Sequence, residues 1–515
     1  MTSSYKEESN RRWHSRHHHW ALKISAKLLA WTATVFLETK NSRVQWAGAL
    51  IFAVALGITP SALAQAEDYS YSKHNQTAII TKYTGPGGDV IIPNGIDGYP
   101  VVRINNEAFL GCSSLTSVVI PGTVTSIGWG AFSDCSNLTR VEIPASVTSI
   151  EGSAFVRCSS LASVVIPEGV TKIEIRVFAD CTSLASVVIP EGVTSIRWQA
   201  FFGCSSLASV VIPGSVTSFD SSTFSDCTSL ANVVIKDGVT SIGLHMFASC
   251  TSLTSVEIPN SVTSIGGSAF SGCSSLASVV IPGSVTSIGQ NAFSHCSSLT
   301  SVEIPEGVTT IERWMFIGCS NLASVVIPNS VTSIGERAFY FCESLTSAAI
   351  PNKVTIIGKN AFSGCSSLPS VVIPEGVTSI EESTFSDCTS LASVVIPNSV
   401  TNIGPYAFYE CSSLTSAVIP DKVTSIERNT FYGCSSLTSV VIPNSVTSID
   451  AYAFYGCSSL TSVVIPEGVT CIREWTFFGC NSLTSVVIPA SVTKIEKWAL
   501  AGCENLASAY FAGPP

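Results

Sequence analysis

Cysteine is the residue whose type and spacing first suggest chemistry in this chain of 515 residues. Eighteen of its 19 cysteines recur every 23 residues, from Cys112 to Cys503. Equivalent residues in stacked layers would lie one strand spacing apart, within the usual Cα distance for a disulfide. Their Cβ atoms would nevertheless point in parallel and stay too far apart, and no C-x-x-C pair suggests zinc. We therefore expect a ladder of buried thiols that pack as small apolar groups, with disulfides or metal binding as the alternatives.

Other candidates for catalysis are few. After residue 64, histidine occurs only at His74, His245 and His295, and the last two fall at different places in the repeat. The abundant serines come with no base or oxyanion hole, and no calcium-loop, P-loop or zinc-helix motif occurs. Cys471 replaces a serine between two apolar residues and should face outward, as an inert substitution or as a link to a partner. The sequence predicts no enzyme, no metal site and no cofactor.

The repeat that positions these residues is counted here from its cysteine as position 1, and leucine always follows at position 4. In the first unit Val118 and Ile120 should point inward from one strand, which Pro121 ends. Val124 and Ile127 lie three residues apart and predict a short second strand. The next segment, AFSD, is long enough only for one helical or 3-10 turn. Since one unit buries too little by itself, the period predicts a solenoid whose apolar columns merge into one core.

The unit C-x-x-L-x-x-V-x-I-P-x-x-V-x-x-I-x-x-x-A-F-x-x resembles the BspA-type leucine-rich repeat, a 23-residue class found in secreted and surface proteins of bacteria and some protists. The resemblance covers about Gly88 to Phe511. It implies a leucine-rich-repeat solenoid of the α/β class, mostly β, with one strand, a short second strand and one helical or 3-10 turn per layer. It also implies extracellular protein binding, often adhesion, without naming a ligand.

The N-terminal segment has the pattern of a secretory signal. Lys40 and Arg43 precede an apolar run of 13 residues, and the small-residue end Ala62-Leu63-Ala64 predicts cleavage after Ala64. The run is short for a membrane span, which needs about 20 residues. We interpret the preceding stretch RRWHSRHHHW as part of an extended signal region, with a metal-binding or membrane-touching tract as the alternative.

Four segments are therefore expected. Residues 1–64 form the signal region, and residues 65–87 form an N-terminal β cap, because they alternate like a hairpin. Residues 88–111 form an atypical first repeat with extra residues before its second strand. Residues 112–515 hold eighteen repeats, the last of them incomplete.

The charge of the chain limits its partners. Residues 1–64 hold 8 of the 26 basic and 3 of the 36 acidic residues, which leaves a formal net charge of −15 on the remainder. An acidic chain without a basic stripe is unlike proteins that bind nucleic acid or anionic membranes. We expect extracellular or cell-surface proteins as partners, with self-association as a further class, no nucleic acid, and no membrane span in the mature chain.

The units differ most at positions 17–19, where several tryptophans lie, and position 22 is aromatic in four successive units. Stacked layers would line these rings up, and surface aromatic residues are typical interface anchors. Half-buried packing of the rings is the alternative. A stripe of outward serine and valine on the main strand is a second surface, although valine is also simply a good strand former. The candidate partner-binding residues are Tyr406, Tyr409, Tyr432, Tyr452, Tyr455, Trp475 and Phe478.

Taken together, these patterns predict a secreted or cell-surface, non-catalytic protein-binding or adhesion module that presents a long leucine-rich-repeat surface. The alternative is a structural surface or matrix component that self-associates and has no specific ligand. The two hypotheses differ in what removal of the rings at position 22 would change: capture of a partner, or oligomeric size.

Overall fold

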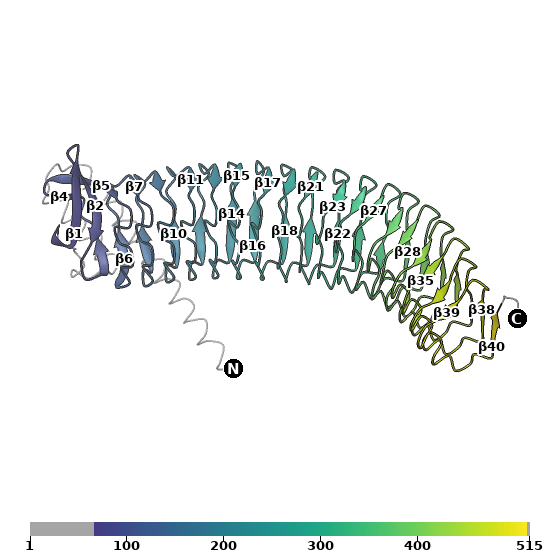
Figure 1. The fold of residues 1–515 in the computed structure, drawn as a ribbon. Helices are drawn as coiled ribbons and strands as arrows, with labels where there is room; N and C mark the ends of the chain where they lie inside the picture. Colours follow the sequence, from purple (N-terminus) through teal and green to yellow (C-terminus); the bar gives the residue numbers. More distant parts are fainter. Residues whose placement is uncertain (1–65, 512–515) are drawn as a thin grey trace, which may run out of the picture.

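Each 23-residue unit forms one turn of a β-solenoid in the computed structural model, which describes residues 66–511. The turns stack into a rod that runs nearly straight from its N-terminal end and bends in its C-terminal third (Figure 1). The signal region predicted over residues 1–64 lies outside the described residues. Among the residues described, no helix is long and apolar enough to cross a bilayer.

The main strand of each layer carries the SVV run, and these strands pair in parallel with their neighbours in register, as Ser163 does with Ser186. Alternate side chains of this strand face the core, so Val118 and Ile120 are buried as predicted. The main strands are β3 (Gly88–Ile91), β6 (Leu115–Val119), β8 (Arg140–Glu142), β10 (Ser163–Val165), β12 (Ser186–Val188), β14 (Ser209–Ile212), β16 (Asn232–Ile235), β18 (Ser255–Glu257), β20 (Ser278–Val280), β22 (Ser301–Glu303), β24 (Ser324–Val326), β26 (Ser347–Ala348), β28 (Ser370–Val372), β30 (Ser393–Val395), β32 (Ser416–Val418), β34 (Ser439–Val441), β36 (Ser462–Val464), β38 (Ser485–Ile488) and β40 (Ser508–Phe511).

The second strand forms another wall of the rod, and in most layers it is two residues long and points one side chain inward, the isoleucine at position 16. The threonine at position 14 is exposed beside it, and its hydroxyl often donates to the backbone carbonyl of the preceding layer, as Thr194 does to Thr171 at 3.3 Å. The second strands are β5 (Tyr99–Ile104), β7 (Ser126–Ile127), β9 (Ser149–Ile150), β11 (Lys172–Ile173), β13 (Ser195–Ile196), β15 (Ser218–Phe219), β17 (Ser241–Ile242), β19 (Ser264–Ile265), β21 (Ser287–Ile288), β23 (Thr310–Ile311), β25 (Ser333–Ile334), β27 (Ile356–Ile357), β29 (Ser379–Ile380), β31 (Asn402–Ile403), β33 (Ser425–Ile426), β35 (Ser448–Ile449), β37 (Cys471–Ile472) and β39 (Lys494–Ile495).

The segment expected to form a helical or 3-10 turn makes the i-to-i+3 hydrogen bonds of such a turn without becoming a helix. The amide of Ala131 donates to Gly128 at 3.2 Å, and that of Cys135 donates to Phe132 at 3.3 Å. Gly130 and Asp134, at positions 19 and 23, have left-handed backbone angles, which interrupt a right-handed helix. Within residues 66–511 the helical element is the 3-10 helix η2 (Ala66–Asp68).

The phenylalanine at position 21 forms the spine of the core. Consecutive rings from Phe109 to Phe477 stack with centroids 4.8 to 5.8 Å apart. Leu138, Val147 and Ile150 show the other buried columns of a layer. The repeat therefore places a continuous apolar core behind every surface of the rod.

The N-terminal end of the core is covered by an antiparallel hairpin of β1 (Tyr69–His74) and β2 (Thr77–Tyr83). β2 pairs in parallel with β5, and β4 (Gly95–Ile96) pairs with β5 in the antiparallel direction. Tyr83 stacks on Phe109 with ring centroids 4.9 Å apart, and Tyr69 packs on Tyr83. The hairpin thus ends the column of phenylalanine rings with tyrosines.

Candidate partner-binding surface

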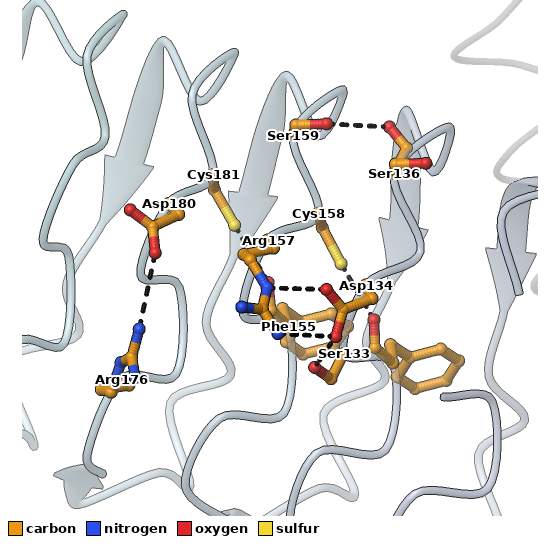
Figure 2. A network of polar contacts seen from close by, with 11 residues as sticks. Ser133, Asp134, Ser136, Phe155, Arg157, Cys158, Ser159, Arg176, Asp180 and Cys181 are labelled. Carbon is orange, nitrogen blue, oxygen red and sulfur yellow. Dashed lines mark hydrogen bonds and ion pairs between the residues drawn. The ribbon is translucent and has the colours of Figure 1, made fainter. Parts of the chain in front are cut away.

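The cysteines of the repeat form the buried ladder that their spacing predicts. Cys158 and Cys181 point in the same direction from neighbouring layers (Figure 2). Each thiol of the ladder from Cys135 to Cys503 also donates a hydrogen bond of 3.1 to 3.3 Å to the carbonyl of the phenylalanine 26 residues earlier, which the sequence did not predict. Position 1 is therefore a structural contact between layers.

Burial also keeps these thiols unreactive. It raises the pKa of Cys227 and of Cys388 to about 12, so the nucleophilic thiolate is scarce near neutral pH. Cys471, outside the ladder, is half-buried in β37 and not fully outward. His245 and His295 both lie in the turns, at different columns of the repeat. Over residues 66–511 no three histidine, cysteine or acidic side chains are grouped to hold a metal ion.

The predicted aromatic residues come together on the wall formed by the turns. The rings at position 22 stack in one column, with centroids 4.8 Å apart for Tyr409 and Tyr432, 4.6 Å for Tyr432 and Tyr455, and 5.0 Å for Tyr455 and Phe478. All four residues are half-buried. The sequence therefore predicted this column correctly, and its role in binding stays a prediction.

A second column runs beside the first at position 19. Tyr452 stacks on Trp475 at 6.0 Å, and Trp475 stacks on Trp498 at 5.7 Å. Trp498 was not among the predicted site residues, although it is exposed and continues the column. The two columns touch within a layer, as between Trp475 and Phe478 at 4.8 Å. We call the combined surface the aromatic face: Tyr406, Tyr409, Tyr432, Tyr452, Tyr455, Trp475, Phe478 and Trp498.

The column at position 19, called the outer column, carries large rings on a left-handed backbone that this position has throughout the repeat, as at Arg176 and Ser222. Tyr406, Tyr452, Trp475 and Trp498 have φ angles of 59°, 61°, 60° and 62°. This left-handed region costs roughly 1–2 kcal/mol for most residues and is entered readily by glycine and asparagine. Asn429 stands at the same position between Tyr406 and Tyr452. The fold thus accepts asparagine here, yet several layers of this wall carry a ring.

The valine stripe on the main strands is exposed as expected. Its side chains at position 8 are 46% to 69% accessible, and Glu257 and Glu303 interrupt it. The stripe extends along most of the rod, whereas the aromatic face is confined to the layers near the C-terminal end. The exposed valines are Val165, Val188, Val211, Val234, Val280, Val326, Val372, Val395, Val418, Val441 and Val464.

Family comparison agrees with the geometry of the layers. The model of the BspA type leucine rich repeat region (6 copies) matches residues 102–231, 220–346, 332–450 and 424–513. The chain belongs to this family. BspA-type repeat proteins are known as non-catalytic, and the repeat is consistent with a protein-binding module.

Solved structures similar to this BspA-type chain are bacterial leucine-rich repeat proteins. One from Bacteroides ovatus ATCC 8483 is 28% identical, with a TM-score of 0.55 over 84% of this chain and 98% of the other. A leucine rich cell surface protein from Faecalibacterium prausnitzii A2-165 is 28% identical, with a TM-score of 0.34 over 89% and 96% of the two chains. A comparison with curated proteins finds no match.

Sequence reasoning missed two features of this BspA-type surface. The left-handed backbone at position 19 left a trace in the sequence, because glycine or asparagine occupies it in four other layers, at Gly130, Asn291, Asn360 and Asn429. The pairing of the acidic side chains at position 23 left none, because arginine pairs with Asp134 from the next layer and with Asp180 from within the same layer.

Proposed function

We propose that this chain is a secreted or cell-surface, non-catalytic protein-binding module that acts in adhesion through its aromatic face. The signal pattern that ends at Ala64 supports the location, and the BspA-type repeat supports protein binding. The clustered, half-open rings support the choice of surface, because tyrosine and tryptophan supply most of the binding energy in many interfaces.

The observation that carries this proposal is the left-handed backbone under Tyr406, Tyr452, Trp475 and Trp498. Unfavourable backbone conformations persist where the surrounding structure enforces them, and they cluster at functional sites. Asparagine lowers this cost at position 19, as it does at Asn429, and most other layers carry smaller or non-aromatic residues there. Retention of rings there favours a use for the rings beyond the fold.

The test is capture of extracellular and matrix proteins by the full chain and by a variant of the outer column. That variant carries Tyr452→Asn, Trp475→Asn and Trp498→Asn. Trp314→Asn is the matched control, since Trp314 has the same position and a φ of 59° but lies far along the rod from the aromatic face. We expect one partner to be retained by the wild type and the control and lost by the triple variant. Equal capture by all three proteins would refute the assignment of the site.

A structural surface or matrix component is the second candidate, and the exposed valine stripe favours it. A weakly polar face repeated along most of the rod suits lateral association of identical chains. Sedimentation of the full chain over a range of concentrations separates the two candidates. Concentration-dependent growth of the particle without capture of any partner would favour the structural role.

A further inference from the structure

The acidic residues at position 23 are neutralised by arginine in the N-terminal layers. Arg157 donates to Asp134 through two nitrogens, at 2.6 and 3.0 Å, and Arg176 lies 3.5 Å from Asp180 (Figure 2). Arg157 also lowers the pKa of Asp134. In two of the five layers with an acid at this position, the carboxylate is therefore paired with a cation.

Two acids at the head of the aromatic face lack such a cation. Asp387 and Glu410 occupy position 23 in successive layers, and within residues 66–511 no lysine or arginine pairs with either. Asp387 accepts a hydrogen bond from Ser386 at 2.6 Å. Burial, followed by the charge of Asp387, raises the pKa of Glu410. The surface thus carries two neighbouring negative charges without a counterion of their own.

Both acids adjoin the first rings of the column at position 22, called the inner column. The amide of Asp387 donates to the carbonyl of Tyr409 at 2.7 Å, and the amide of Glu410 donates to Tyr432 at 2.7 Å. The Glu410 carboxyl lies over Gly433, where an added Cβ would come within 2.6 Å of it. A larger residue at position 433 would therefore displace the carboxyl group.

In the layers that follow Glu410, position 23 is glycine and carries no side chain. Gly433, Gly456, Gly479 and Gly502 follow one another at position 23 with φ angles of 70° to 72°. A Cβ on Gly456 would lie 3.8 Å from the Cα of Gly433, so these backbones stack directly. Beside the stacked rings runs a strip of bare backbone that begins at two unpaired acids.

The rings of this face already accept cations from the chain itself, because Lys497 lies 5.4 Å from the ring centroid of Trp498. The guanidinium of Arg428 lies 5.1 Å from the ring centroid of Tyr452. Such contacts between a cation and the face of an aromatic ring are attractive. The combination of ring faces with carboxylates suits an ammonium or guanidinium group on an aliphatic stem.

We propose that the aromatic face binds an extended segment of a partner protein through a lysine or arginine side chain. The cationic head lies at Asp387 and Glu410, and the stem lies along Tyr409 and Tyr432. The partner's backbone follows the glycine strip. This inference rests on the proposed function and specifies the chemistry of the partner, and the net charge of −15 after residue 64 is complementary to it.

Fluorescence anisotropy with labelled hexalysine at low ionic strength tests the proposal, with a glycine–serine hexapeptide as the uncharged probe. The test variant is Asp387→Asn with Glu410→Gln, which removes both charges and keeps the shapes. The matched control is Asp226→Asn. Asp226 has the same position, accepts a hydrogen bond from Ser225 at 3.1 Å and has no aromatic column beside it. We expect the test variant to bind hexalysine about tenfold more weakly and the control to bind it like the wild type.

Three results would overturn this inference: no binding of hexalysine to the wild type, equal binding by the test variant, or an equal loss in the control. Thermal unfolding of both variants verifies that the rod is intact. A different result would refute the proposed function. A partner that is lost by the triple asparagine variant but kept by Asp387→Asn/Glu410→Gln supports the aromatic face and refutes its cation site. A partner kept by the triple variant refutes the face itself.

Discussion

At the scale of single residues, each buried cysteine joins two layers of the rod. The carbonyl of Phe270 accepts the amide of Cys273 at 3.2 Å within its own turn and the thiol of Cys296 at 3.2 Å from the next layer. Position 1 therefore needs a side chain that is small, apolar and able to donate. Alanine meets two of these needs and cysteine meets all three.

Replacing one such thiol should destabilise the rod measurably. Cys296→Ala removes the hydrogen bond to Phe270 and leaves a small cavity, so we expect a loss of about 1–2 kcal/mol in the free energy of unfolding. Urea unfolding followed by circular dichroism measures it. Cys471→Ala is the control and should stay within about 0.5 kcal/mol of the wild type. Equal midpoints for the two variants would show that the thiol bond contributes nothing.

The thiol ladder should also make the rod sensitive to alkali. Burial raises the pKa of Cys227, Cys273 and Cys319 from near 9.0 to about 12. Unfolded thiols return to the ordinary pKa, so between these values the unfolded state releases protons that the folded state keeps. The stabilising effect is complete below about pH 9 and is lost as the pH rises toward about 12.

Urea midpoints measured from pH 7 to 11 under reducing conditions check this dependence. We expect a level region up to about pH 9 and then a steady fall. Cys296→Ala should fall less steeply, because it has one titrating thiol fewer. Parallel curves for the variant and the wild type would contradict this account.

At the scale of the element, the turn between the second strand and the next cysteine carries core residues and surface residues at separate positions. Phe454, at position 21 of one turn, is fully buried in the core, whereas Tyr452 and Tyr455 at positions 19 and 22 are half-exposed. The left-handed residues at positions 19 and 23 set this alternation, because they reverse the chain without a helix. One short segment thus supplies both a core column and the aromatic face.

Substitutions in one turn should show this separation. Phe454→Ala should cost about 3–5 kcal/mol, as is usual for a buried phenylalanine. Tyr452→Asn should change stability by no more than about 1 kcal/mol, because relief of the left-handed backbone offsets the lost ring contacts. Thermal or urea unfolding of the two variants compares them. A large loss for Tyr452→Asn would mean that the ring serves packing, and that the backbone observation no longer supports a binding role.

The sequence predicted the elements of each layer far better than the state of the surface. Period and residue type were enough for the buried positions of Val124 and Phe132, since every layer repeats the same environment. They also predicted that Tyr432 and Tyr455 would stack. The left-handed backbone of Trp475 was marked only by glycine and asparagine at position 19 of other layers. The unpaired charge of Glu410 depends on which side chains surround it, which its own type does not specify.

At the scale of the whole molecule, stability is distributed along one dimension. The core of each layer packs against the layers before and after it, and only surface ion pairs within residues 66–511, such as Arg103 with Glu151, reach two layers away. The rod therefore behaves mainly as a chain of nearest-neighbour contacts. The hairpin of β1 and β2 is not a repeat layer and packs on one end of the rod, where Tyr83 covers the first ring of the phenylalanine column. Its loss should therefore act locally.

Tyr83→Ala tests how many layers are destabilised by the loss of one packing contact at the end of the rod. We expect a loss of about 3–5 kcal/mol in the stability of the cap and the first layers. Hydrogen exchange should speed up there, over residues 66–140, and stay unchanged in the central layers. The same measurement on Phe454→Ala should place faster exchange around residue 454 instead. Uniform acceleration along the rod in either variant would show that the layers unfold as one cooperative unit.

The direction of the contacts between layers has a consequence for how such a chain changes in evolution. Each thiol reaches back 26 residues to a phenylalanine carbonyl, and each bonded threonine at position 14 reaches back 23. Recombination between misaligned repeats that removes or adds one unit joins an equivalent donor to an equivalent acceptor. Rod length is thus free to drift among descendants, and the distance between the N-terminal hairpin and the aromatic face changes in steps of one layer.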